Sequence, residues 1–91
     1  MDGHPHVSPE VAASPWRTMA ADAAREWWRD HPGAPLDEYD EWVYREYEPM
    51  ALRGMGVSAG WRRLTATQRA ALDAIHVGLA EGAALRRQRA A

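Results

Sequence analysis

The chain of 91 residues contains no cysteine, no phenylalanine, no lysine and no asparagine, and Ile75 is its single isoleucine. Without cysteine it has no disulfide framework, no thiolate nucleophile and no zinc–thiolate site. The missing lysine, asparagine and phenylalanine together are a bias typical of a high-GC genome, so we attach no function to the use of arginine alone. The domain is therefore expected to hold together by packing, either by itself or with a partner.

Long apolar runs are also missing. No run approaches the roughly 18 residues of a membrane span, and the first residues lack the basic flank and apolar segment of a signal peptide. We therefore expect a cytoplasmic protein without membrane association. Charged residues make up 26% of the chain, as in a globular domain. A chain of this length buries only about 60 to 65% of its unfolded surface, so one small core is expected.

Charge of each sign is concentrated in one half of the chain. Residues 1–48 contain eleven acidic residues and four arginines, whereas residues 49–91 contain two acidic residues and seven arginines. The simplest interpretation is that the two halves pair with each other in the fold, within one chain or between chains. The alternative is that one of the halves meets a partner of opposite charge.

The first helix is predicted between two clear signals. Ser14 followed by Pro15 is typical of an N-cap with proline in the first turn, and His31-Pro32-Gly33 is typical of a stop. We therefore expect a helix from Pro15 to Asp30. The residues of its predicted apolar face are Trp16, Met19, Ala20, Ala23 and Trp27.

A second helix is predicted to start at Leu36 and Asp37, with acidic residues in its first turn, and to be kinked or restarted by Pro49. At helical spacing its apolar stripe contains Tyr39, Trp42, Val43, Tyr47 and Met50. Tyr44 falls outside that stripe among acidic neighbours. The candidate partner-binding residues on this opposite side are Asp37, Asp40, Glu41, Tyr44 and Glu48.

Three glycines in residues 53–60 predict a loop, after which Thr65 to Gln68 has the pattern of a capping box that opens a third helix. The predicted apolar face of this helix contains Ala71, Leu72, Ile75, Leu79 and Ala83. Gly78 and Gly82 lower its helix propensity, so residues 83–91 are expected to fray.

The predicted fold class is therefore all-α, a small irregular bundle of three main helices plus short helical turns. Residues 1–13 are expected to form an N-terminal arm, residues 14–85 the domain and residues 86–91 a basic tail. The larger core members are expected to be Trp16, Trp27, Trp42 and Trp61.

Catalytic and metal sites find little support in the sequence. The four histidines lack partners at a ligand spacing, His76 fits a boundary position on its helix, and His31 suits a helix end. No nucleophile motif and no phosphate-binding glycine loop is present. We expect no enzyme activity, no metal and no cofactor.

Residues 64–79, LTATQRAALDAIHVGL, resemble the opening helix of helix-turn-helix modules of the response-regulator type. The resemblance implies nucleic-acid binding. Only twelve residues follow Leu79, so a recognition helix would be short. The candidate phosphate-binding residues are Arg86, Arg87 and Arg89, which could contact the nucleic-acid backbone without recognising the base sequence.

The favoured hypothesis is a non-catalytic protein that binds a macromolecule stoichiometrically through its acidic and aromatic helix face, most readily a protein with a basic groove. Phage-encoded inhibitors of bacterial defence, anti-CRISPR proteins included, are of this character, and some imitate nucleic acid. One alternative is a nucleic-acid-binding or transcription-associated accessory protein that uses the arginine-rich half. Another is a small subunit of a larger assembly.

Overall fold

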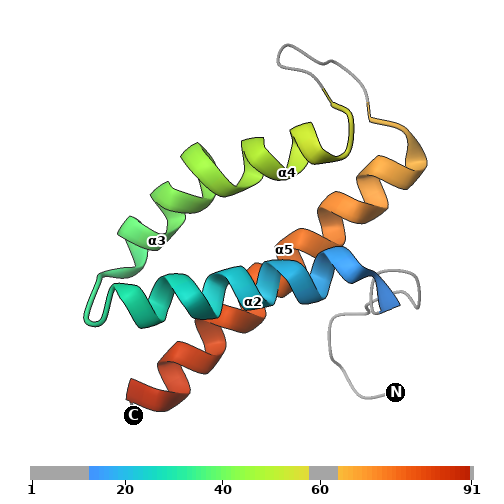
Figure 1. The fold of residues 1–91 in the computed structure, drawn as a ribbon. Helices are drawn as coiled ribbons and strands as arrows, with labels where there is room; N and C mark the ends of the chain where they lie inside the picture. The colour runs from blue at the N-terminus through green and yellow to red at the C-terminus, as the bar shows by residue number, and fades with distance from the viewer. Residues whose placement is uncertain (1–12, 58–63, 91) are drawn as a thin grey trace.

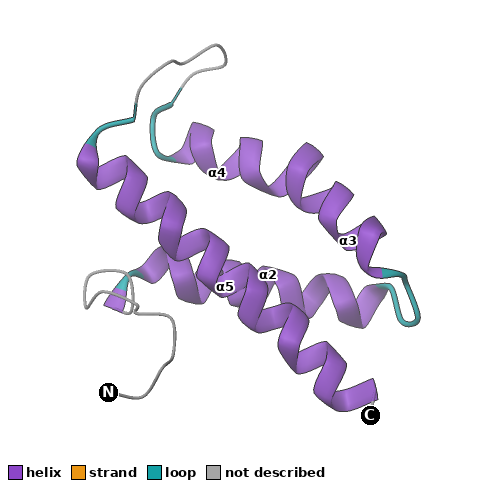
Figure 2. Cartoon of the chain, turned by 180° about the vertical axis from the view of Figure 1, so that it is seen from behind, coloured by secondary structure: helices purple, strands orange, loops and turns teal. Residues whose placement is uncertain are grey.

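The computed structural model describes residues 13–57 and 64–90, with side chains given up to residue 84. The elements within these ranges are the helices α2 (Pro15–Asp30) and α3 (Leu36–Trp42), the π-helical turn η1 (Val43–Tyr47), and the helices α4 (Glu48–Gly54) and α5 (Ala66–Ala90). Because α3, η1 and α4 follow one another without a break, the described part of the chain forms three helical bodies and has no strand (Figure 2). The predicted all-α bundle of three main helices is confirmed.

The capping residues predicted from the sequence set the helix ends. The Oγ atom of Ser14 accepts a hydrogen bond from the Trp16 amide at 3.2 Å, and α2 begins at Pro15 and ends at Asp30 as expected. Thr65 and Gln68 form the reciprocal bonds of a capping box, 2.9 Å and 3.1 Å long, ahead of α5. In the turn after α2, Gly33 has a φ of 81°, a conformation that favours glycine.

Helices α2 and α5 cross each other (Figure 1), and small residues lie where their backbones approach. Ala20 and Ala24 are buried on α2, opposite Gly78 and Gly82 of α5. A Cβ atom added to Gly78 would lie 2.2 Å from the carbonyl oxygen of Arg17, and one added to Gly82 would lie 2.3 Å from the Cβ of Ala24. The two backbones therefore touch, which only glycine at these two positions permits.

This contact corrects the expectation that α5 weakens at its glycines. Instead of fraying from residue 83, the helix continues to Ala90, so the backbone of residues 86–90 is helical. Gly78 and Gly82 do lower the intrinsic helix propensity. They also allow α2 to approach, and the packing that results stabilises the helix where propensity alone would not.

The second part of the core is an aromatic cluster between α2 and the α3–η1–α4 body. The ring centroids of Trp28 and Tyr39 lie 4.9 Å apart, and those of Trp42 and Tyr47 lie 5.4 Å apart. The Tyr39 hydroxyl donates a buried hydrogen bond of 2.7 Å to the carbonyl oxygen of Leu79 on α5. Large rings thus fill the space on this side, whereas small residues close the crossing of α2 and α5.

The structure corrects several predicted core positions. Trp28 is the buried tryptophan of α2, and Trp16, Trp27 and Trp42 are partly buried residues at the edge of the core. The side chains of Met19 and Met50 are 54% and 52% exposed, although both were placed on apolar faces. On α5 the predicted face is largely right, with Leu72 half-buried and Ile75 fully buried. Trp61 lies outside the described residues.

Pro49 accounts for the π-helical turn before it. A proline inside an α-helix has no amide hydrogen, and its ring clashes with the carbonyl four residues back. Here the preceding turn is widened, and the Glu48 amide donates to the carbonyl of Val43, five residues back. After this turn, Ala51, four residues beyond Tyr47, is buried in the core, whereas Met50 is exposed.

The molecule is flat, with principal extents of 39 × 37 × 18 Å. Its Cα radius of gyration is 13.9 Å, against about 12 Å expected for a compact domain of this length. None of the described helices is both long enough and apolar enough to span a membrane.

Candidate functional site

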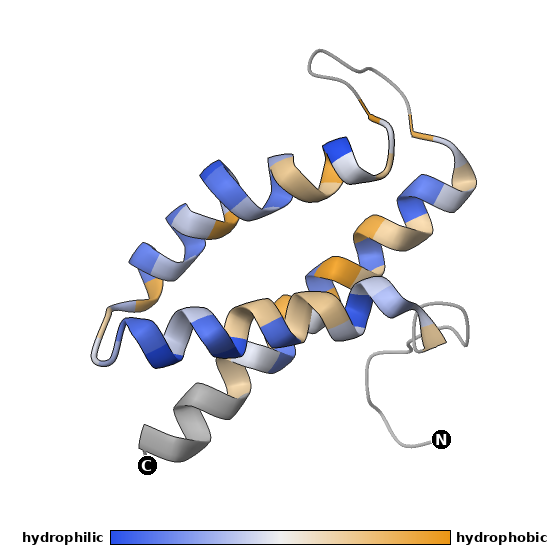
Figure 3. Cartoon of the chain, in the orientation of Figure 1, coloured by the Kyte–Doolittle hydropathy of each residue, from blue (hydrophilic) through white to orange (hydrophobic). Residues whose placement is uncertain are grey.

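Four of the five predicted partner-binding residues lie together on the outward side of α3 and η1. Asp37, Asp40, Glu41 and Tyr44 are all exposed, and the Tyr44 side chain, at 76%, is the most exposed of the large hydrophobic residues described. Figure 3 shows mostly hydrophilic positions along this stretch of helix. We call these four residues the acidic face. The prediction that Tyr44 lies outside the core is confirmed.

The carboxylates of the acidic face differ in what they contact. Glu41 is bonded to a neighbour on its own helix, since its Oε2 lies 3.1 Å from the Nε of Arg45. Asp37 and Asp40 form no ion pair with any side chain that the structure describes. Two uncompensated carboxylates therefore stand beside an exposed tyrosine ring, within about two helical turns.

Glu48, the fifth predicted residue, lies elsewhere. Its Oε2 is 2.6 Å from the Nε2 of His76, and its side chain is only 24% exposed. It therefore joins the first turn of α4 to α5 and does not belong to the acidic face. The contact also agrees with the prediction that His76 is a boundary histidine with a polar partner.

His31 has a structural role at the end of α2. Its ring stacks on Trp27 with centroids 4.2 Å apart, and its Nδ1 donates to the Trp27 carbonyl oxygen at 2.8 Å. The hydrogen bond satisfies one of the carbonyl groups that the end of a helix leaves unpaired. This contact agrees with the structural interpretation of His31 given by the sequence.

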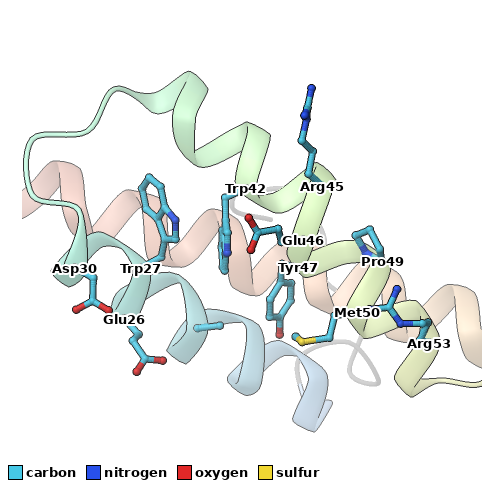
Figure 4. A pocket seen from close by; sticks show the side chains of 11 residues that line it. Glu26, Trp27, Asp30, Trp42, Arg45, Glu46, Tyr47, Pro49, Met50 and Arg53 are labelled. Carbon is cyan, nitrogen blue, oxygen red and sulfur yellow. The ribbon is translucent and has the colours of Figure 1, made fainter.

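Two grooves flank the α3–η1–α4 body. The larger, of about 590 Å³, lies between α2 and η1–α4, and Trp27, Trp42 and Met50 are among its lining residues (Figure 4). Charged side chains of both signs surround it, namely Glu26, Asp30, Arg45, Glu46 and Arg53. We call it the tryptophan groove. Because the rim carries both acidic and basic side chains, it favours neither an anionic nor a cationic ligand.

The smaller groove, of about 300 Å³, lies between α3–η1 and α5, and we call it the α3–α5 groove. Its lining residues are Leu36, Tyr39, Asp40, Val43, His76, Leu79, Ala80 and Ala83. Asp40 belongs both to this groove and to the acidic face, so the two surfaces are continuous. The sequence could not reveal the groove, because its two walls lie about 40 residues apart in the chain and no local pattern pairs them.

The charge-rich halves of the chain are not extensively paired with each other in the described part. The ion pairs Arg25–Asp22, Arg29–Glu26 and Arg45–Glu41 each lie within one helical body. Among the described side chains, only Arg17–Glu81 and His76–Glu48 join the two halves. Arg53 and Arg69 are exposed and have no ion pair with a described side chain. The backbone of Arg86, Arg87 and Arg89 lies in the last turns of α5, and their side chains are outside the description.

None of the resolved pKa shifts belongs to a residue of the acidic face. Burial raises the pKa of Tyr39 and of Tyr47, both members of the aromatic cluster. The hydrogen bond from Arg17 lowers the pKa of the Glu81 carboxyl, and that pair links α2 to α5. These shifts are explained by core packing and by a contact between helices. Among the described residues, no group of three or more histidine or acidic side chains is arranged to hold a metal ion.

The acidic face and the two grooves are thus the surface features that bear on function. No protein-family model, no curated protein and no solved structure matches the chain.

Proposed function

We propose that this protein is non-catalytic and binds a protein partner stoichiometrically, with its acidic face against a basic surface of that partner. The observation that carries the proposal is the exposure of Tyr44, a large ring of which 76% faces solvent on the outside of a helix. Tyrosine is among the residues most enriched at the energetic centres of protein interfaces, because a stiff ring buries much area at little entropic cost.

The surroundings of Tyr44 support the same function. Asp37 and Asp40 are uncompensated by described cations, and they would steer a basic partner toward the ring. Tyr44 also lies in η1, and π-helical turns within α-helices are frequent at functional sites. A rigid helix holding the ring and both carboxylates would lose little conformational entropy on binding.

Nucleic-acid binding is the second candidate, and it is favoured by Arg53 and Arg69, which are exposed and form no ion pair with a described side chain. Phosphates would be repelled by the acidic face, so nucleic acid would have to bind on another side of the molecule. The narrower hypothesis of a nucleic-acid mimic that inhibits bacterial defence stays a prediction. With Glu41 and Glu48 bonded within the chain, only Asp37 and Asp40 of the five predicted residues offer a carboxylate without a described cation nearby.

A charge-reversal experiment tests the proposal. A partner is captured from the native host on the full chain and purified, and its association rate is measured with the wild type and with Asp37→Arg/Asp40→Arg. We expect association at low salt to slow by about tenfold, with the difference shrinking as salt rises. The matched control, Asp22→Arg/Asp73→Arg, makes the same charge change on α2 and α5 and should leave the rate within about twofold.

The proposal would be contradicted if both double variants slowed association equally, or if neither of them changed the association rate. Binding of the wild type to duplex DNA or RNA, measured over a salt series, distinguishes the second candidate. Nucleic-acid affinity that falls steeply with salt, together with no captured protein sensitive to the acidic face, would favour the nucleic-acid function.

A further inference from the structure

The α3–α5 groove is an open channel beside the acidic face. Leu36, which begins one wall, is 50% exposed although it is a large apolar residue. The opposite wall is low, because Ala80 and Ala83 supply only methyl groups. An apolar surface of this kind, bordered by polar groups, commonly marks a site of interaction.

Two contacts and the length of its walls define how the groove is built. At one end, His76 of α5 is bonded to Glu48. In the floor, the Tyr39 hydroxyl is bonded to the Leu79 carbonyl, which fixes the distance between the two walls. Each wall spans seven residue steps, 36 to 43 on one side and 76 to 83 on the other, or about 10 Å of helix. The groove is therefore about two helical turns long.

These dimensions suit a helix laid along the groove. A volume of about 300 Å³ lies at the lower limit for small-molecule sites, and those sites enclose most of the ligand. Helix-in-groove recognition needs less enclosure, since an amphipathic helix inserts a few apolar side chains spaced three or four residues apart. Two turns of groove provide room for two such side chains.

The charge along the groove indicates that the helix docked there would be basic. Asp40 is the only carboxylate among the described lining residues, and it has no ion pair with a described side chain. Asp37 and Tyr44 lie one turn before and after it, which extends the same polar border. The histidine among the lining residues, His76, is already bonded to Glu48. An arginine or lysine beside the apolar anchors of a docking helix would meet Asp40 with both charges partly desolvated.

We propose that the α3–α5 groove docks one basic amphipathic helix of the partner protein. Two apolar side chains of that helix, three or four residues apart, lie between Leu36 and Ala80, and a neighbouring cation binds Asp40. The inference rests on the proposed function, and it names the partner element that the acidic face receives. Other occupants would be a helix in the tryptophan groove, a second copy of this chain, or residues 1–12 of the chain itself.

The experiment uses a defined probe. A displayed library of randomised helical peptides of about 14 residues, an ordinary helix length, is selected against the full chain. We expect the selected peptides to share a cation and two large apolar residues at a spacing of three or four. Affinities are then measured for three variants. Ala80→Arg fills the groove from an exposed helical position, Asp40→Asn removes the charge, and the control Met50→Arg obstructs the tryptophan groove.

We expect Ala80→Arg to weaken peptide binding by more than about 30-fold, Asp40→Asn by about three- to tenfold, and Met50→Arg by less than about twofold. Circular dichroism melts establish that each variant is folded. If Ala80→Arg were the only unstable variant, Asp40→Asn would test the groove by itself. Peptide binding should then be weaker and should depend less on salt than binding to the wild type. Peptides sensitive to Met50→Arg but not to Ala80→Arg would overturn the inference, as would a failure to select any with a Kd below about 100 µM.

The remaining outcomes concern the other occupants. Self-association abolished by Ala80→Arg would assign the groove to a second copy, and peptide binding that appears only after removal of residues 1–12 would assign it to that segment. Either result would overturn the proposed partner helix. Binding of the captured host protein that is lost with Asp37→Arg/Asp40→Arg but kept with Ala80→Arg would leave the proposed function standing and refute the groove. Insensitivity to both variants would refute both.

Discussion

At the scale of single residues, stability depends most on Ile75. Its side chain is 0% exposed, and it is the only large residue described whose side chain is fully buried. We expect Ile75→Ala to lower the free energy of unfolding by about 2 to 5 kcal/mol, because a core this small cannot close around the cavity. Urea melts measure the change. Met19→Ala, at an exposed position, is the control and should cost less than about 0.5 kcal/mol; equal losses at both sites would contradict the described core.

The two tyrosines of the aromatic cluster give stability a dependence on alkaline pH. Burial raises the pKa of both Tyr39 and Tyr47 in the folded state. Unfolded tyrosine loses its proton near pH 10, so the unfolded state binds fewer protons above that pH and stability falls as pH rises. The chain has no lysine and no cysteine, which leaves little else to titrate in this range.

Urea melts at pH 8 and at about pH 11 test this prediction. We expect the wild type to lose stability with a slope of up to about 1.4 kcal/mol per pH unit for each of the two buried tyrosines. Tyr39→Phe/Tyr47→Phe should flatten the slope, although it also removes the bond to Leu79. Tyr44→Phe serves as the control at an exposed position. A slope equally steep in the Tyr39→Phe/Tyr47→Phe variant would mean that other groups cause the alkaline loss.

Which individual residues were predictable depended on the kind of signal they carry. Ser14, Thr65 and Gln68 were placed correctly because capping is a local rule that needs no tertiary contact. Tyr44 was placed correctly because three of its four neighbours at helical spacing, Asp40, Glu41 and Glu48, are acidic. Trp28 was missed because the large apolar residues Trp16, Met19 and Trp27 suggested a different buried face of α2. The face that is buried contains alanines together with Trp28.

At the scale of helical elements, the crossing of α2 and α5 reverses the usual effect of replacing glycine. Alanine at a helix interior is normally favoured over glycine by about 1 kcal/mol. At Gly78 the added Cβ would lie 2.2 Å from a backbone oxygen of α2, which cannot move without separating the helices. We expect Gly78→Ala to destabilise the domain by about 2 kcal/mol or more.

The control for this substitution is Gly54→Ala, at the end of α4. There the added Cβ would meet a Trp16 ring atom at 3.6 Å, an ordinary contact. The change should be neutral or slightly stabilising. Thermal melts of both variants give the comparison, and an increase in stability with Gly78→Ala would show that α2 and α5 do not approach as closely as described.

The elements differ in how far the sequence determined them. The bounds of α2 follow from Ser14, Pro15 and the His31-Pro32-Gly33 turn, all local signals. The π-helical turn was foreseen only as a kink at Pro49, because the choice between a break and a widened turn depends on what the buried residues contact. Gly78 and Gly82 were judged by propensity alone, and only the position of α2 reveals their packing role. The α3–α5 groove is likewise a tertiary feature.

At the scale of the whole molecule, a flat arrangement of three helical bodies places two surfaces beside each other. The acidic face and the α3–α5 groove share Asp40, and His76, a lining residue of the groove, is bonded to Glu48. Core packing explains Tyr39, Tyr47 and Ile75. It does not explain why a large ring at position 44 faces solvent among acids, and the proposed binding of a partner rests on that exposure.

The most direct test is the affinity of the purified host partner for Tyr44→Ala, measured by calorimetry beside the wild type and beside Met19→Ala, which truncates another exposed apolar residue. We expect Tyr44→Ala to weaken binding by about 30-fold or more, which corresponds to about 2 kcal/mol, while its free energy of unfolding changes by less than about 1 kcal/mol. Met19→Ala should leave the affinity unchanged within about twofold. Unchanged affinity for Tyr44→Ala would contradict the role of the acidic face and leave Asp37–Glu48 a structural helix with a solvated charged side.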